Sequence, residues 1–177
     1  MRTRYKVLEQ GVPHFITSTV VEWIPVFTSS IYCDVVIQSL KFCREQKGLK
    51  LYGFVIMDSH IHLVAFAENL SQVMKEFKSY TATRLIKSLE NNGNKRVLND
   101  MAFFKGRDKT SSQHQFWQEG YHPQAVTTEE MLLQKLEYIH NNPVRRGLVE
   151  RPEYWRYSSA ANYFDGNPVM EIDGIIG

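Results

Sequence analysis

Alternating apolar and polar residues predict strands in the first half of the chain. The run His14–Val21 is rich in β-branched and aromatic residues, which favours a strand. Two further apolar runs, Phe54–Met57 and Leu63–Phe66, lie on either side of a short Asp58-Ser59 break. They indicate two neighbouring strands. A fourth strand is expected within residues 115–126.

Three- and four-residue spacing of apolar side chains predicts helices between these strands. The first helix is expected to begin at a cap near Ser29 or Ser30 and to end at Gln46, before Gly48. The second is expected to follow a cap at Ser71 and to end by the breaker cluster 91–94. Residues 93–115 are polar and irregular and are expected to form a flexible loop.

The last predicted helix begins with a capping box formed by Thr127 and Glu130, and Pro143 is expected to end it. At about 100° per residue, its apolar side chains gather on one side. These are Leu132, Leu133, Leu136 and Ile139. Nearly opposite lie Met131, Lys135, Tyr138 and Asn142. Tyr138 and Asn142 are four residues apart, so they face the same way.

The order β-α-β-β-α-β predicts an α+β fold of the ferredoxin-like kind. In that fold an antiparallel sheet carries its helices on one face. The final helix is added to this unit. We expect a single domain over residues 1–163 and a short acidic tail over residues 164–177.

Composition is typical of a globular protein. The chain has 177 residues, of which 43% are hydrophobic and 12% aromatic, and no apolar run approaches the ~20 residues of a membrane span. No secretory signal is visible at the start. Cys33 and Cys43 are too few for a disulfide framework and are expected in the core. A cytoplasmic protein with no membrane partner is therefore expected.

The net charge of +2 does not by itself indicate a nucleic-acid partner, but its distribution is uneven. Between Lys75 and Lys109 there are nine Lys or Arg residues against four Asp or Glu. A local basic region can contact phosphates, although a solvated helix face explains it equally well. The candidate phosphate contacts are Lys75, Lys78, Lys95, Arg96, Arg145 and Arg146.

His60 and His62 carry the strongest chemical signal. Residues i and i+2 of a strand share one face, so the two imidazoles are expected side by side, with Ile61 pointing the other way. Such a pair can bind one divalent metal ion. Two structural histidines in a half-buried strand are the alternative, but burying two titratable groups is costly unless something pairs with them.

Four blocks, in order, resemble the single-tyrosine HUH transposases, and most closely the REP-associated tyrosine transposases. They are Gly53–Leu63, Phe116–His122, Tyr138–Val149 and Tyr154–Ala160. The third block, Tyr-Ile-His-Asn-Asn-Pro-Val-Arg-Arg-Gly-Leu-Val, is the most specific. The chain departs from the family at Asp58-Ser59, where relatives often have proline followed by asparagine, aspartate or glutamate.

The resemblance implies nicking and strand transfer of single-stranded DNA through a 5′-phosphotyrosine link. The position that matches the family's nucleophile is Tyr138, and the matching metal ligands are His60, His62 and Asn142. The metal would be Mg²⁺ or Mn²⁺. The DNA would carry a hairpin, and family members act as monomers or as homodimers.

Other interpretations stay open at this point. Tyr80 also follows the histidines and is a second candidate nucleophile. The chain could instead be a non-catalytic module that grips a DNA or RNA hairpin, which the departure at Asp58-Ser59 and the modest net charge favour. A hydrolase of small phosphate esters would rest on the histidine pair alone.

Overall fold

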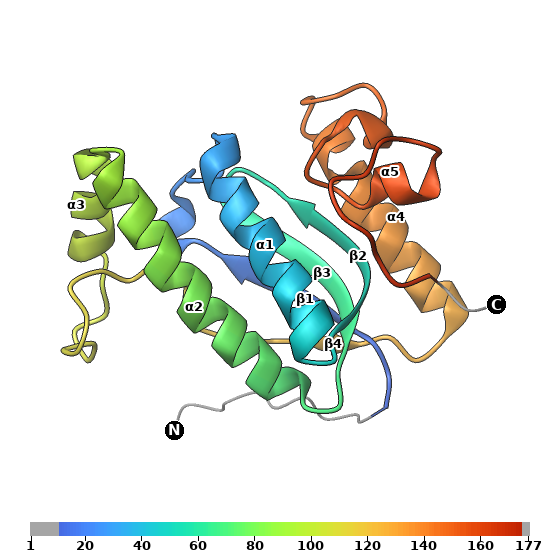
Figure 1. Ribbon diagram of the computed structural model, residues 1–177, viewed down its shortest axis with the longest axis horizontal. Coiled ribbons are helices and arrows are strands. Elements are labelled where there is room, and N and C mark those ends of the chain that lie inside the picture. Colours follow the sequence, from blue (N-terminus) through green and yellow to red (C-terminus); the bar gives the residue numbers. More distant parts are fainter. Residues whose placement is uncertain (1–10, 175–177) are drawn as a thin grey trace.

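A four-stranded antiparallel sheet lies at the centre of the molecule, with strand order β2-β3-β1-β4. This computed structural model describes residues 11–174 (Figure 1). The strands are β1 (His14–Thr19), β2 (Lys50–Ile56), β3 (His60–Phe66) and β4 (Gln124–Ala125). The predicted α+β fold with an antiparallel sheet is confirmed.

The register of β1 and β3 decides which side chains share a face. Thr17 lies opposite His62, and Thr19 lies opposite His60. Because side chains alternate along each strand, these four share one face of the sheet. Ile61 and its neighbours at every second position of β3 point to the other face and join the larger hydrophobic core.

That larger core lies under α1 (Ser30–Gln46) and α2 (Leu70–Asn91), which run side by side across one face of the sheet (Figure 1). The bounds of α1 agree with the prediction. The cap of α2 does not: Asn69, rather than Ser71, accepts a hydrogen bond from the backbone N–H of Gln72 at 3.2 Å. Asparagine is as good a cap as serine, so the local sequence offered two starts.

Helix α4 (Glu129–Arg145) contacts β2 and β3 on the face opposite α1 and α2. Its cap is Thr128, whose hydroxyl accepts from the N–H of Met131 at 3.1 Å, and not Thr127. Gly53 of β2 lets the helix approach, because a Cβ there would overlap the side chain of Leu136. A smaller apolar cluster fills this contact.

Pro143 does not end α4, contrary to the sequence prediction. The helix continues through it to Arg145. Proline removes only one helical hydrogen bond, and the last turn is closed by later donors. The N–H of Arg146 bonds the carbonyl of Asn142 at 3.1 Å, and that of Leu148 bonds Pro143 at 2.9 Å. Leu136 and Ile139 are buried as predicted, whereas Leu133 is 53% exposed.

Residues 93–126 differ most from the prediction. The expected loop 93–115 contains α3 (Lys95–Phe103), whose first turn follows Asn94. The expected strand within 115–126 is reduced to the two residues of β4 and a single bridge between Val20 and Trp117. Pro123 has no N–H to give to a ladder, which fits the short β4 that follows it.

The remaining described segments close one edge of the sheet. A short turn at Pro152–Tyr154 and α5 (Ala160–Tyr163) follow α4. Asp173 then accepts the backbone N–H of Leu51 at 2.8 Å and an N–H of Arg44 at 3.0 Å. Within residues 11–174, no helix has both the length and the apolar character needed to cross a membrane.

Both cysteines are buried and reduced, as expected of core residues. Burial raises the pKa of the Cys33 thiol to about 12 and that of Cys43 to about 11. At neutral pH both are therefore thiols rather than reactive thiolates.

Candidate active site

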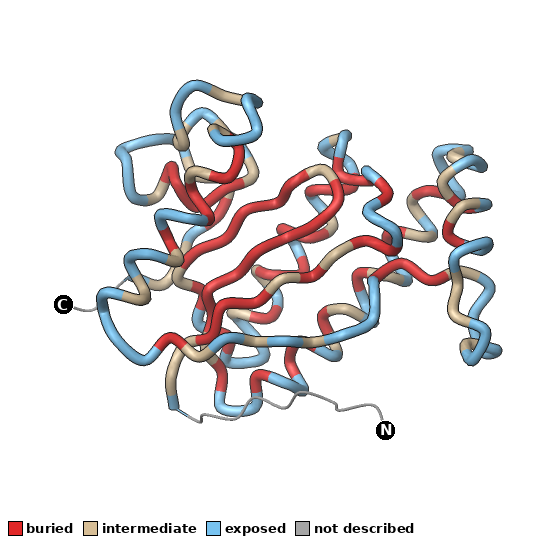
Figure 2. Tube along the Cα trace, turned by 180° about the vertical axis from the view of Figure 1, so that it is seen from behind, coloured by how far each residue is buried: buried red, intermediate tan, exposed pale blue. Residues whose placement is uncertain are grey.

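The paired histidines of β3 lie on the sheet face opposite α1 and α2. Figure 2 views the molecule from the side of this face. Their ring centroids are 4.8 Å apart and the rings are nearly perpendicular. His60 is 5% exposed and His62 is 6% exposed. Ile61 between them points into the core on the other side. The side-by-side placement inferred from the alternation is therefore what the structure has.

Each imidazole is held through the same ring nitrogen. Nδ1 of His62 lies 2.8 Å from the hydroxyl of Thr17, and Nδ1 of His60 lies 3.4 Å from that of Ser59. Among the residues that the structure describes, no hydrogen bond reaches either Nε2. Hydroxyl partners on Nδ1 fix the ring orientation and leave Nε2 as the available ligand atom.

Both histidines are neutral at neutral pH. Burial, with smaller contributions from the nearby His60, Arg145 and Lys135, lowers the pKa of His62 to about 3. Burial also lowers the pKa of His60, although Asp58 opposes that shift. Metal binding requires neutral imidazole, so this environment prepares the pair for a cation without prior loss of a proton.

Tyr138 of α4 comes to the same place from a segment far away in sequence. Its ring centroid lies 5.6 Å from that of His62 and 5.8 Å from that of Phe15, edge to face in both cases. Phe15 also stacks on His62 at 5.3 Å. The Tyr138 side chain is nevertheless 42% exposed, so solvent and ligands can reach it. The phenol and the imidazole pair thus meet within one chain.

Two cationic side chains lie near the Tyr138 and Phe15 rings. The guanidinium of Arg145 lies 4.5 Å from the Tyr138 ring centroid and donates a hydrogen bond to the Tyr138 carbonyl at 3.0 Å. Lys135 places its ammonium group 4.6 Å from the ring centroid of Phe15. The face that carries the histidines can therefore attract an anion, such as a phosphate.

Asn142 lies one turn after Tyr138 and is 7% exposed. No hydrogen bond of its side-chain amide is found among residues 11–174. No ring contact or hydrogen bond joins it to the histidines within the same residues. The structure thus brings His60, His62 and Tyr138 together through ring contacts, and it places Asn142 one turn after Tyr138 on α4 as a buried amide.

Comparison with known proteins assigns a family. The sequence profile of the family described as "Transposase IS200 like" matches residues 12–107. This is more than half of the chain. The chain belongs to the IS200-like transposase family. Its function is accordingly transposase-like and directed at DNA.

One solved structure shows the same fold. A REP-associated tyrosine transposase bound to a REP hairpin superposes with a TM-score of 0.63 over 100% of both chains, at 16% sequence identity. A proposed transposase from Deinococcus radiodurans R1 gives a TM-score of 0.48 over 80% of this chain and 97% of that one, at 17% identity. Comparison with curated proteins gives no significant match.

The predicted DNA-contacting residues of this transposase fall in separate places. Arg145 borders Tyr138, and Arg146 pairs with Asp58 at 3.4 Å across the turn before His60. Lys75 is exposed on α2, and Lys95 and Arg96 are exposed at the start of α3. The structure therefore does not gather the six into one basic stripe.

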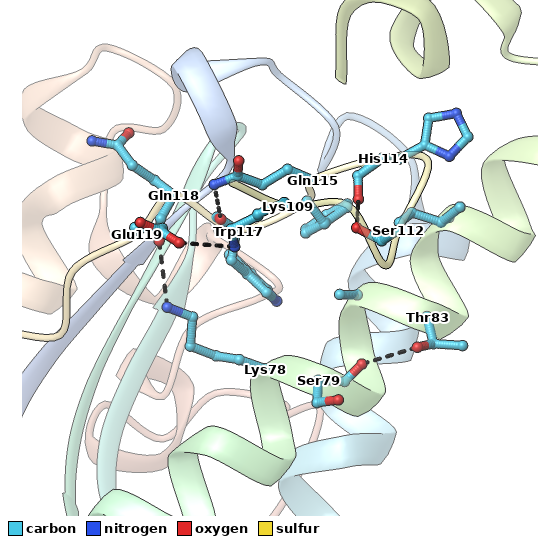
Figure 3. Close-up of a pocket in the computed structure, with 13 residues that line it drawn as sticks. Lys78, Ser79, Thr83, Lys109, Ser112, His114, Gln115, Trp117, Gln118 and Glu119 are labelled. Atoms are coloured by element: carbon cyan, nitrogen blue, oxygen red, sulfur yellow. Dashed lines mark hydrogen bonds and ion pairs between the residues drawn. The ribbon is translucent and has the colours of Figure 1, made fainter. Parts of the chain in front are cut away.

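Lys78 lies in a pocket of about 380 Å³ between α2 and residues 109–119 (Figure 3). Its ammonium group donates to the carbonyl of Gln118 at 3.5 Å, and burial lowers its pKa. Across the pocket Lys109 pairs with Glu119 at 3.0 Å. Neither histidine of β3 lines this pocket, so it is separate from the site around Tyr138.

Sequence reasoning missed four residues of the site: Phe15, Thr17, Trp23 and Lys135 in that role. For Phe15 and Thr17, the alternation of β1 was the available signal, since both fall on the face shared with His62. Lys135 had been placed on the same side of the helix as Tyr138. No local sequence pattern predicts a role for Trp23, whose ring centroid lies 5.4 Å from that of His60.

The residues present fit a divalent cation. Two neutral imidazoles with free Nε2 atoms and one amide would give an uncharged ligand set, with positions left for water and phosphate oxygens. Within residues 11–174, no group of three or more His, Cys, Asp or Glu side chains is placed to hold a metal ion. A cation at this site would therefore depend on the histidine pair and the amide.

Proposed function

We propose that this transposase cleaves and rejoins single-stranded DNA with a divalent metal ion, using Tyr138 as the nucleophile. The observation that supports this most strongly is the contact between Tyr138 and His62 of the same chain, 5.6 Å between ring centroids. A surface-accessible phenol beside two neutral imidazoles supplies a nucleophile and a cation site at one point. Core tyrosines and structural histidines have no need of that arrangement.

The covalent step follows from these positions. The Tyr138 oxygen attacks the phosphorus, a bond forms between them, and the bond from phosphorus to the 3′-oxygen breaks. The phenol proton passes to solvent, and the departing oxygen takes up a proton to become a 3′-hydroxyl. Attack by the 3′-hydroxyl of another strand end on the 5′-phosphotyrosine reverses these changes and restores Tyr138.

His60, His62 and Asn142 would hold the metal ion, Mg²⁺ or Mn²⁺, which would polarise the scissile phosphate when bound. Thr17 and Ser59 keep the imidazoles oriented through Nδ1. The guanidinium of Arg145 beside the phenol ring stabilises negative charge that develops on the tyrosine oxygen and on the phosphate.

The proposed partner is single-stranded DNA with a hairpin. A related fold binds a REP hairpin, and this chain carries cations both at the site and at the pocket around Lys78. Lys75, Lys78, Lys95, Arg96, Arg145 and Arg146 are the proposed phosphate contacts. Contacts of this kind add affinity without reading sequence.

A denaturing gel tests the proposal. The protein is incubated with Mn²⁺ and a library of hairpin oligonucleotides whose single-stranded flanks are randomised, and protein–DNA adducts that survive detergent are recovered and sequenced. We expect adducts with the natural chain and none with Tyr138→Phe. Tyr80→Phe is the matched control, because Tyr80 is also exposed, at 57%, and should leave adduct formation unchanged.

Adducts formed by Tyr138→Phe would exclude Tyr138 as the sole nucleophile. Tight hairpin binding without an adduct in any divalent metal would instead favour a non-catalytic hairpin-binding module.

The same site predicts that Tyr138 serves the histidines of its own chain, whether or not the protein is a homodimer. Mixing His62→Ala with Tyr138→Phe should then restore no activity, since neither chain has both groups. Recovery of a substantial share of wild-type adduct in the mixture would show that the tyrosine serves a partner's histidines.

A further inference from the structure

Trp23 sits in a backbone conformation that ordinary residues avoid. Glu22 and Trp23 have φ values of +50° and +57°, two consecutive non-glycine residues in the left-handed region. Such a conformation is strained in a non-glycine residue, and strain of this kind persists only where the surroundings enforce it. Here the flanking residues Val20, Val21 and Ile24 are buried and anchor the turn.

The strained turn places the Trp23 indole at the surface beside the histidine pair. The side chain is 57% exposed, and its ring meets His60 edge to face at 5.4 Å. No hydrogen bond of its indole N–H is found within residues 11–174. The other two tryptophans differ: Trp117 donates to the Thr81 hydroxyl at 3.0 Å, and Trp155 donates to the Ile56 carbonyl at 3.0 Å.

Four rings form a row along this face. Tyr138 is 5.6 Å from His62, His62 is 4.8 Å from His60, and His60 is 5.4 Å from Trp23. The proposed nucleophile lies at one end of the row and the indole lies at the other. A flat, exposed aromatic ring at the rim of a nucleic-acid site is the usual platform for a nucleobase.

The in-line geometry of phosphoryl transfer indicates which nucleobase would stack on Trp23. In phosphoryl transfer the attacking and leaving oxygens lie roughly in line, on opposite sides of the phosphorus. With the phosphate over the histidines and Tyr138 attacking from the His62 end, the departing 3′-oxygen points toward His60 and Trp23. The nucleotide that carries this oxygen is the one immediately 5′ of the cut.

We propose that Trp23 stacks on the base of the nucleotide immediately 5′ of the cleaved phosphate and so holds the released 3′-hydroxyl in place for rejoining. This rests on the proposed function, which supplies the position of the phosphate. Stacking tolerates any base, so the contact positions the strand without specifying sequence.

Substitution of both stacking partners tests the contact. Trp23→Gly removes the ring and suits a positive φ, so we expect its thermal midpoint to be no lower than that of the natural chain. The DNA change is an abasic nucleotide immediately 5′ of the cleavage position found by sequencing the adducts. Each change alone should lower the rate of adduct formation at subsaturating DNA about 10- to 100-fold.

Together the two changes should lower the rate no further than either one alone, because they remove the same contact. Trp23→Phe should restore most of the rate with intact DNA. Phe42→Ala is the matched control, since Phe42 is 54% exposed on α1, which covers the opposite face. No effect of Trp23→Gly, or two losses that multiply, would overturn the inference while leaving the Tyr138 chemistry intact.

The absence of any adduct would count against the proposed function and not against the stacking. A binding measurement still tests the stacking in that case. A 12-nucleotide oligothymidylate should quench the tryptophan fluorescence of Tyr138→Phe. The quenching should disappear when Trp23→Phe is added, because Trp117 and Trp155 are bonded within the fold. Equal quenching with and without Trp23 would contradict stacking on this residue.

Discussion

On β3, Ile61 and Leu63 face α1 and α2, whereas His60 and His62 face the side that α4 only partly covers. All four are buried, so exposure does not separate the two faces. Their partners do. The apolar side chains meet other apolar side chains, while the histidines meet hydroxyls, aromatic rings and cations.

The comparison shows how a single strand can serve stability and chemistry at once. The α1–α2 face supplies the larger hydrophobic core. The opposite face is therefore free to carry buried polar groups, whose cost is limited by hydrogen bonds and by neutral protonation states. Substitutions in the α1–α2 core should change stability most, and substitutions of the polar residues on the other face should change activity most.

Substitution of two neighbouring residues of β3 is the sharpest test of this difference between the two faces. His62→Ala should lower adduct formation by more than about 100-fold, because a proposed metal ligand is lost, while the free energy of unfolding falls by about 1 kcal/mol. Leu63→Ala should cost about 2–5 kcal/mol and retain adduct formation where it stays folded. Urea denaturation and the gel assay measure the two quantities. Equal stability losses at both positions would refute the division.

Gly53→Ala should sharpen the comparison by displacing α4 without touching the α1–α2 core. A Cβ at Gly53 overlaps Leu136, so we expect a stability loss of about 1–3 kcal/mol from overpacking. Adduct formation should fall as well, because Leu136 lies two residues before Tyr138. Leu136→Ala in the same chain should relieve the overlap. If the double variant were less active than both single variants, the overlap would not be the cause.

Low pH should destabilise the fold through the buried His140 of α4. Burial lowers the pKa of His140 on α4 to about 4, and its Nε2 lies 2.8 Å from the Ser159 hydroxyl. Below about pH 6.5 the unfolded chain takes up a proton that folded His140 does not, so the free energy of unfolding decreases as the pH is lowered. In the presence of a chelator, the natural chain should lose about 2 kcal/mol more than His140→Gln between about pH 7.5 and about pH 5. Parallel pH profiles would contradict this.

The smallest expected effect belongs to Thr17→Val. Loss of the hydroxyl partner of His62 should raise the Mn²⁺ concentration for half-maximal adduct formation about tenfold. Stability should stay within about 0.5 kcal/mol, because valine suits a strand as well as threonine does. Thr83→Val, on α2, is the matched control. An unchanged Mn²⁺ requirement would show that Thr17 does not help His62 to bind the metal ion.

The sequence allowed much of the fold to be predicted, because period-two and helical patterns encode which side of each element is buried. The placement of His60 beside His62, and of Tyr138 away from the apolar stripe of its helix, followed from those periods. The contact between them did not, since packing of α4 on the sheet depends on details such as Gly53. The turn at Trp23 could not be predicted either, because neither of its two residues with positive φ is a glycine.

Identification of the residue that becomes linked to DNA tests the central claim most directly. After trapping with Mn²⁺ and the selected hairpin strand, nuclease and trypsin digestion should leave a nucleotide remnant on one peptide, read by mass spectrometry. We predict the remnant on residues 136–145, a tryptic peptide whose single tyrosine is Tyr138. A remnant on residues 79–84, which contain Tyr80, would contradict the account.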